Sequence, residues 1–183
     1  MNATRFGELE VLCHAPERVT HEHPLLFVHG AYVSAWCWEE HFQPWFAHRG
    51  WSTYAVSLSG HGKSRKREHL DSYSIDDYVR DVAEVAARLP APPILIGHSM
   101  GGMLAARYAL EHPARTEQLV MINPLGLEDW QAKGVPYVSI DQLYQSQLRT
   151  NAEGIKAYQL KYYYNGVWKP EYDRWVDMLY GMY

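Results

Sequence analysis

The stretch "ILIGHSMGGMLAARYAL", residues Ile94 to Leu110, predicts a strand, a tight turn with Ser99 at its apex, and a helix. Glycines two residues before and two residues after the serine leave room for a backbone that side chains would crowd. Such a turn holds a serine hydroxyl out of the sheet, where it can attack a carbonyl carbon. The sequence therefore predicts that Ser99 is a nucleophile and that its turn is supported by Gly97, His98, Gly101 and Gly102.

Short apolar runs alternate with helical patterns on both sides of this stretch. Strands are predicted at residues 24–30, 51–58, 92–98 and 116–123, and helices at residues 36–50, 74–89 and 100–111. Gly50 ends the first of these helices, in which Pro44 is an irregularity. Alternation of this kind is typical of an α/β fold, in which helices flank a mostly parallel sheet.

The helix at residues 74–89 has the clearest pattern of the chain. Ser74 is a good N-cap residue, and Asp77 follows it three residues later. Ile75, Val79 and Val82 fall on one helical face, which we expect to be buried.

A change of character after residue 123 predicts a domain boundary. Residues 124–183 contain no convincing buried strand, and they hold most of the tyrosines. We therefore expect a core domain at residues 1–123 and a helical cap or lid at residues 124–183. Aromatic residues at helical spacing in the second segment are more often core than ligand contacts.

A second motif, "FVHGAYVSAW", places His29 and Gly30 at the end of a predicted buried strand. A glycine there lets the chain turn and expose the backbone N–H of Ala31 toward the serine. Together with the N–H of Met100, this group would form an oxyanion hole, and each donor would stabilise the transition state by roughly 3–4 kcal/mol. His29 is expected to shape this turn.

These motifs, with the glycine-punctuated loop Gly60 to Ser64, resemble the α/β-hydrolase superfamily in order and spacing over roughly residues 5–125. The resemblance implies a serine hydrolase of carboxylic esters, lipids or similar acyl substrates, working through an acyl-enzyme on a small molecule without a cofactor. It also implies a cap domain in the aromatic segment. The stretch "HGAYVSAWCW" is similar to hydroxynitrile-lyase-like and methylesterase-like members of the same fold.

The catalytic base is the missing part of the pattern. The family carries its acid and histidine after the nucleophile, beyond two further strands that we do not find in this sequence, so a truncated core is expected. His112 is the only histidine after Ser99, and it ends a helix roughly 18 Å away. His29, His61 and His98 are weak substitutes, and Glu128 and Asp129 are weak candidates for the acid. A catalytically impaired fragment or pseudoenzyme, acting as a binding module or scaffold, therefore remains an alternative.

Composition excludes several other classes of function. A formal net charge of −4 argues against nucleic acid as a partner, and the basic cluster at residues 63–67 predicts a solvated loop. Two cysteines do not make a disulfide framework. The "HEH" run at residues 21–23 has no third ligand at a suitable spacing, so no metal site is predicted.

Location and association are also predicted. The sequence shows no signal peptide and no run long enough for a membrane span, which favours a cytoplasmic protein. If the sheet ends at the strand that holds Leu119 to Ile122, its apolar edge is open, and self-association through it is expected.

Overall fold

The computed structural model describes residues 2–66 and 72–181. The chain divides into two compact units, Met1–Glu128 and Asp129–Tyr183, which are described separately below. The predicted division at residue 123, with its assignment of a core and a cap, stays a prediction.

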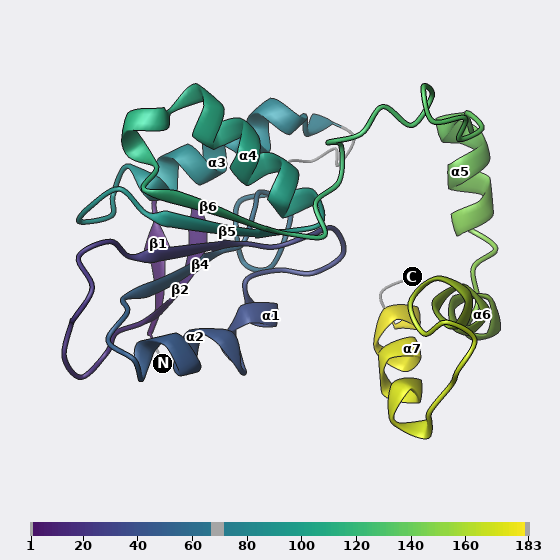
Figure 1. The fold of residues 1–183 in the computed structure, drawn as a ribbon, viewed down its shortest axis with the longest axis horizontal. Helices are drawn as coiled ribbons and strands as arrows, with labels where there is room; N and C mark the ends of the chain where they lie inside the picture. Colours follow the sequence, from purple (N-terminus) through teal and green to yellow (C-terminus); the bar gives the residue numbers. More distant parts are fainter. Residues whose placement is uncertain (1, 67–71, 182–183) are drawn as a thin grey trace. The chain divides into compact units, whose positions relative to one another are not determined.

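A six-stranded sheet forms the centre of the first unit (Figure 1). Its strands lie in the order β1-β2-β4-β3-β5-β6. Strand β2 is antiparallel to β1 and β4, whereas β4, β3, β5 and β6 run parallel to one another. The predicted α/β class with a mostly parallel sheet is thus confirmed. The strands are β1 (Asn2–Phe6), β2 (Leu9–His14), β3 (Leu25–Val28), β4 (Thr53–Val56), β5 (Ile94–His98) and β6 (Gln118–Ile122).

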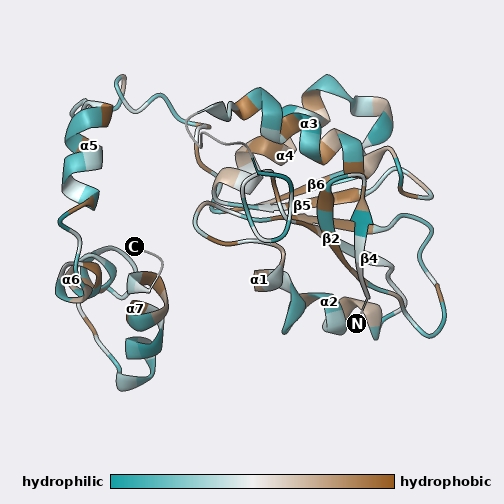
Figure 2. Ribbon diagram, turned by 180° about the vertical axis from the view of Figure 1, so that it is seen from behind, coloured by the Kyte–Doolittle hydropathy of each residue, from teal (hydrophilic) through white to brown (hydrophobic). Residues whose placement is uncertain are grey.

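Helices cover both faces of this sheet (Figure 1). Helices α3 (Ile75–Ala86) and α4 (Met100–Glu111) pack on one face, with a short 3-10 helix, Pro113–Arg115, after α4. Helices α1 (Trp36–Glu39) and α2 (Phe42–Ala47) pack on the other face. The strands and the inner faces of α3 and α4 are the most hydrophobic parts (Figure 2), and burying them provides the main stabilisation of the unit.

The single helix predicted at residues 36–50 is wrong, because α1 and α2 are separate. His41 leaves the helical region with φ −124°, and α2 begins only at Phe42. Pro44 has no N–H to donate to the carbonyl of Glu40, so a continuous helix would lose a hydrogen bond there. The proline is instead accommodated in the first turn of α2, where no such bond is needed.

The second unit is helical within its described part. Helix α6 (Ala152–Tyr162) packs against α7 (Asp173–Tyr180), and Ile155, Gln159 and Val176 on these helices are buried. The Nζ of Lys156 bridges to the carboxylate of Asp173 at 2.7 Å. The helices are α5 (Ile140–Gln147), α6 (Ala152–Tyr162) and α7 (Asp173–Tyr180), with a 3-10 turn at Pro170–Tyr172. None of the described helices in either unit has the length and apolar character that crossing a membrane would need.

Candidate active site

Ser99 lies in the turn that joins β5 to α4, as the sequence predicts. Its backbone has φ 56° and ψ −120°, a conformation that residues other than glycine rarely adopt. Hydrogen bonds to the following segment hold this conformation: the Ser99 N–H donates to Ile122 O at 2.9 Å, and the Leu125 N–H donates to Ser99 O at 3.2 Å. Strain of this kind persists only where the surroundings impose it, and it concentrates at functional sites.

Glycines around Ser99 allow backbone segments to approach one another closely. A Cβ on Gly97 would lie 2.3 Å from the carbonyl oxygen of Gly101, which no side chain could tolerate. A Cβ on Gly101 would lie 2.3 Å from Val28 O, and one on Gly102 would lie 3.0 Å from the Cβ of Pro124. The three glycines therefore let α4 start directly against β3 and β5.

The end of β3 lies beside the serine. A Cβ on Gly30 would be 3.1 Å from the Cβ of Ser99, so the two segments are in van der Waals contact. The N–H of Ala31 donates to no acceptor among the described residues. The N–H of Met100 is the first of α4 and has no acceptor within the helix. Two backbone donors without an acceptor in the described part of the chain thus flank the nucleophile turn.

His29 is completely buried, and both of its ring nitrogens are hydrogen-bonded. Its Nδ1–H donates to Gly30 O at 2.7 Å, and its Nε2 accepts the N–H of Leu58 at 3.0 Å. Burial lowers the pKa of His29 to about 4, the bond to Gly30 opposes this shift, and the nearby His61 ring adds to it. A neutral histidine with both nitrogens occupied cannot also take the proton of Ser99.

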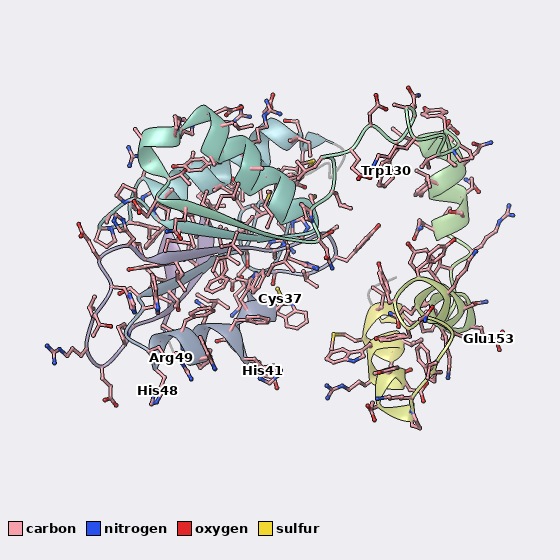
Figure 3. All side chains as sticks on the ribbon, in the orientation of Figure 1. Cys37, His41, His48, Arg49, Trp130 and Glu153 are labelled. Carbon is pink, nitrogen blue, oxygen red and sulfur yellow. The ribbon has the colours of Figure 1, made fainter. Side chains whose placement is uncertain are left out.

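The other predicted substitutes for the base are placed differently. His98 is an exposed residue, and His61 contacts Ser59 O through its Nδ1 at 3.1 Å. His112 ends α4, as expected from the sequence. His41 and His48 flank α2 and point away from the sheet (Figure 3). Within the described residues, the hydroxyl of Ser99 has no hydrogen-bond partner.

The predicted acid candidates lie at the junction between the two units. Glu128 ends the first unit, and Asp129 begins the second. The carboxylate of Asp129 accepts the N–H of Ala132 at 3.0 Å and so stabilises a local turn.

Two strained residues near Ser99 were not foreseen from the sequence. Tyr32 follows β3 with φ 66°, and Asn123 follows β6 with φ 43°. Together with Ser99, they place three positive-φ residues at the carboxyl ends of the neighbouring strands β3, β5 and β6. The residue type does not predict a positive φ at Tyr32. Asn123 is less unusual, because asparagine tolerates a positive φ better than most residues. This clustering makes the carboxyl edge of the sheet the candidate functional edge.

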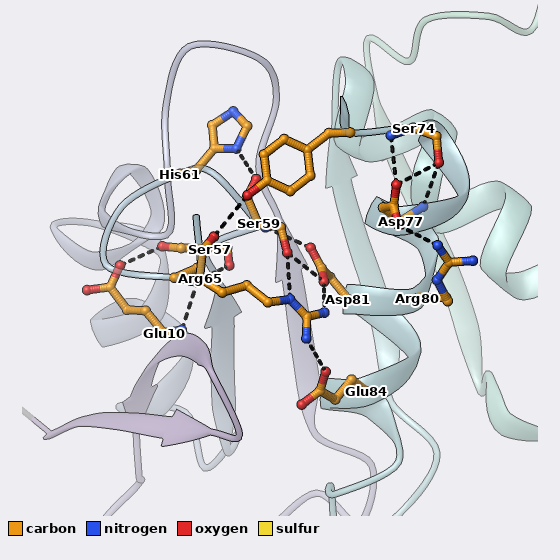
Figure 4. A network of polar contacts seen from close by, with 12 residues as sticks. Glu10, Ser57, Ser59, His61, Arg65, Ser74, Asp77, Arg80, Asp81 and Glu84 are labelled. Atoms are coloured by element: carbon orange, nitrogen blue, oxygen red, sulfur yellow. Dashed lines mark hydrogen bonds and ion pairs between the residues drawn. The ribbon is translucent and has the colours of Figure 1, made fainter. Parts of the chain in front are cut away.

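A buried polar network fixes the loop at residues 57–66 next to this edge (Figure 4). Asp81, on α3, is fully buried and accepts the N–H of Ser59 at 2.7 Å and its hydroxyl at 2.9 Å. The guanidinium of Arg65 pairs with the same carboxylate. The solvated loop predicted at residues 63–67 is therefore wrong for Arg65, and residue 67 lies outside the described residues.

The surface groove between α3 and α4 is not a competing candidate for the active site. Three of its charged residues pair with one another, because Arg107 bridges Asp76 at 2.6 Å and Glu111 at 2.9 Å. None of the described residues that line the groove is a serine or cysteine that could act as a nucleophile.

Comparison with known proteins agrees with this geometry. A solved structure of a probable hydrolytic enzyme from Pseudomonas aeruginosa PAO1 is 43% identical with a TM-score of 0.79, and the match covers 95% of this chain and 55% of that one. The 1-acylglycerol-3-phosphate O-acyltransferase ABHD5 of Homo sapiens is 31% identical over 61% of this chain and 32% of its own length. The pyrethroid hydrolase of Sphingobium wenxiniae is 31% identical over 54% of this chain and 35% of its own.

The matched regions thus span about a third of these curated relatives and about half of the solved structure. The model of the alpha/beta hydrolase fold family matches residues 23–165, which include β3, the serine turn and part of the second unit. Sequence, fold and the geometry around Ser99 therefore lead to one assignment: the chain belongs to the α/β-hydrolase fold family.

Proposed function

We propose that this protein is a serine hydrolase of carboxylic esters or related small acyl compounds, with Ser99 as its nucleophile. The observation that carries the proposal is the strained backbone of Ser99, held between two unpaired backbone donors. In the proposed reaction, the Ser99 oxygen attacks the carbonyl carbon while a base takes its proton. The carbon–oxygen bond to the alcohol then breaks, and the base gives its proton to the departing alcohol oxygen. Water hydrolyses the acyl-enzyme to the carboxylic acid and restores the Ser99 hydroxyl.

The N–H groups of Ala31 and Met100 are the proposed donors to the oxyanion. Loss of one such donor typically slows acyl transfer about 10²- to 10³-fold. Backbone donors need no reorganisation during the reaction, because the strand, the turn and the helix already hold them. His29, Gly30, Gly97, Gly101 and Gly102 support this arrangement.

The names of the relatives suggest the substrate class. A pyrethroid hydrolase and an acylglycerol-phosphate acyltransferase both act on acyl compounds, and both resemble this chain around the proposed nucleophile. We therefore propose a small acyl substrate for this protein as well. We also propose the cytoplasmic location that the sequence predicts.

Labelling with a fluorophosphonate probe tests the proposed function, because such probes react with a serine whose proton is being withdrawn. Stoichiometric labelling that is lost in Ser99→Ala and retained in Ser146→Ala is the expected result. Ser146 is a suitable control, since it lies exposed on α5 and its hydroxyl donates to Leu143 O of the same helix. If labelling occurs, the His61→Gln and His98→Gln variants test for the base. Absence of labelling in the folded protein would overturn the proposal.

A second candidate function is a binding module that keeps the fold without the reaction. The unpartnered hydroxyl of Ser99 favours it, because losing the serine–histidine unit typically lowers turnover about a millionfold. A protein that binds an acyl compound near Ser99 but never reacts with the probe would support this candidate.

We also propose that the protein associates with itself through β6. This strand lies at one end of the sheet order of the described residues, and Val120 and Met121 are each more than 40% exposed. Sedimentation velocity should show association that Val120→Lys weakens. The control Val19→Lys changes an exposed valine that lies outside the strands and should leave association unchanged.

A further inference from the structure

The peptide bond between Gly30 and Ala31 is held by a side chain. The Nδ1–H of His29 donates to Gly30 O at 2.7 Å, inside a region without exposure to solvent. All peptide bonds of the described chain are trans, and a trans peptide points its C=O and its N–H in opposite directions. Fixing Gly30 O therefore fixes the direction of the Ala31 N–H, on the opposite side of the peptide from His29.

The hydrogen of the His29 ring is itself fixed. Leu58 donates its N–H to Nε2 at 3.0 Å, so Nε2 must lack a hydrogen and Nδ1 must carry it. Leu58 is well placed for this, because the next residue, Ser59, is bound to the buried carboxylate of Asp81 at 2.7 Å. The alternative tautomer would set two N–H groups against each other at Leu58 and two acceptors against each other at Gly30.

We propose that His29 is a positioning residue for the oxyanion hole: its neutral Nδ1–H tautomer, selected by Leu58, aims the Ala31 N–H at the carbonyl oxygen of the substrate. This inference rests on the proposed function. It assigns to His29 a role other than that of the base, and it explains why a histidine precedes Gly30 inside the core. An apolar side chain could fill the same space, but it could not orient the peptide.

Two substitutions separate this role from a merely structural one. The amide nitrogen of an asparagine falls near the position of Nδ1, so His29→Asn can still donate to Gly30 O but leaves the buried N–H of Leu58 unpaired. The amide of a glutamine reaches the position of Nε2, so His29→Gln can still accept from Leu58 but releases Gly30 O. Each variant leaves one buried polar group unpaired, but asparagine also leaves part of the imidazole's space empty, so the asparagine variant is expected to be the less stable of the two.

The proposal predicts that function does not follow this order of stability. The fluorophosphonate labelling rate should fall about 100-fold in His29→Gln, as for the loss of one oxyanion donor, and only a few-fold in His29→Asn. Urea unfolding supplies the order of stability. Labelling rates that simply follow stability, with the asparagine variant slower, would overturn the positioning role.

A measurement without any reaction distinguishes failure of this inference from failure of the proposed function. The residual dipolar coupling of the Ala31 N–H reports its direction relative to the amides of β3. It should match the wild type in His29→Asn and change in His29→Gln, whether or not Ser99 reacts. An unchanged coupling in His29→Gln would overturn the inference. Nitrogen-15 spectra of the wild-type imidazole add a test without variants, since a hydrogen on Nε2 would also overturn it.

Discussion

Gly101 lies so close to Val28 that a Cβ added to it would be 2.3 Å from the carbonyl oxygen of Val28. The same Cβ would be 2.4 Å from His29 O, so two backbone atoms of the β3 end occupy the space a side chain would need. This contact sets the first turn of α4 directly on the strand that leads to Ala31. The nucleophile and one proposed oxyanion donor are thus held together through backbone packing, without any side chain between them.

Gly101→Ala should therefore destabilise the protein by about 3 kcal/mol or more, because backbone atoms cannot move aside as a flexible side chain can. The free energy of unfolding in urea measures this effect. Gly154→Ala is the matched control: Gly154 lies in α6, where its Cβ would meet only Asn151 Oδ1 at 3.4 Å. Alanine is a better helix former, so this variant should gain about 0.5–1 kcal/mol. Equal stability of the two variants would contradict the packing argument.

Ser99 is expected to make the protein less stable than a glycine at the same position would. At φ 56° and ψ −120° glycine is unstrained, whereas any Cβ-bearing residue is strained by about 1–3 kcal/mol. Ser99→Gly should therefore be more stable than the wild type, while Ser99→Ala should not. Thermal unfolding of the three proteins checks this order. A glycine variant that melts below the alanine variant would show that the turn is not strained.

Local patterns made part of this structure predictable from the sequence. The glycine spacing around Ser99 predicts the turn, because only glycines fit the close backbone approaches found there. Ser74 and Asp77 predict the start of α3, where each side chain bonds the other's backbone N–H. Signals of this kind lie within a few residues of the feature that they specify.

Features that depend on distant partners were not predictable. Ile75 was expected on the buried face of α3, yet it is 37% exposed, while the charged Asp81 is fully buried. Asp81 is stable there because Ser59 and Arg65, from another part of the chain, supply its hydrogen bonds. The strain at Tyr32 likewise has no local sequence signal. The same limit applies to the base, since a triad histidine is adjacent to its serine in space and not in sequence.

Asp81→Asn should destabilise the protein by about 3 kcal/mol, because it leaves one of the buried donors facing an amide NH₂. The control is Arg80→Gln, which removes the ion pair with Asp77 from the same helix but at a side chain that is 68% exposed. Exposed ion pairs contribute about 0–1 kcal/mol, so this variant should remain near the wild type. Urea unfolding at low and high salt compares the two. A similar small loss in both variants would show that the Asp81 network adds little to stability.

The buried, neutral state of His29 makes stability depend on pH in a defined window. Burial lowers its pKa in the folded protein to about 4, while the unfolded chain binds the proton near pH 6.5. The unfolded state therefore holds more protons between these values, so stability is lost as pH falls from about 6.5 to 4. The pKa difference corresponds to about 3 kcal/mol.

Comparison with His29→Asn isolates this effect, because every other titratable group of the chain is present in both proteins. At pH 7 the wild type should exceed the variant in free energy of unfolding, owing to the bond that Leu58 makes to the ring. That advantage should shrink by about 3 kcal/mol as the pH is lowered from 7 to 4. In the wild type, the unfolded chain binds a proton at His29 that the folded protein does not, whereas the asparagine variant has no such proton to bind. A difference that stays constant across this window would mean that His29 titrates normally and is not held neutral by the fold.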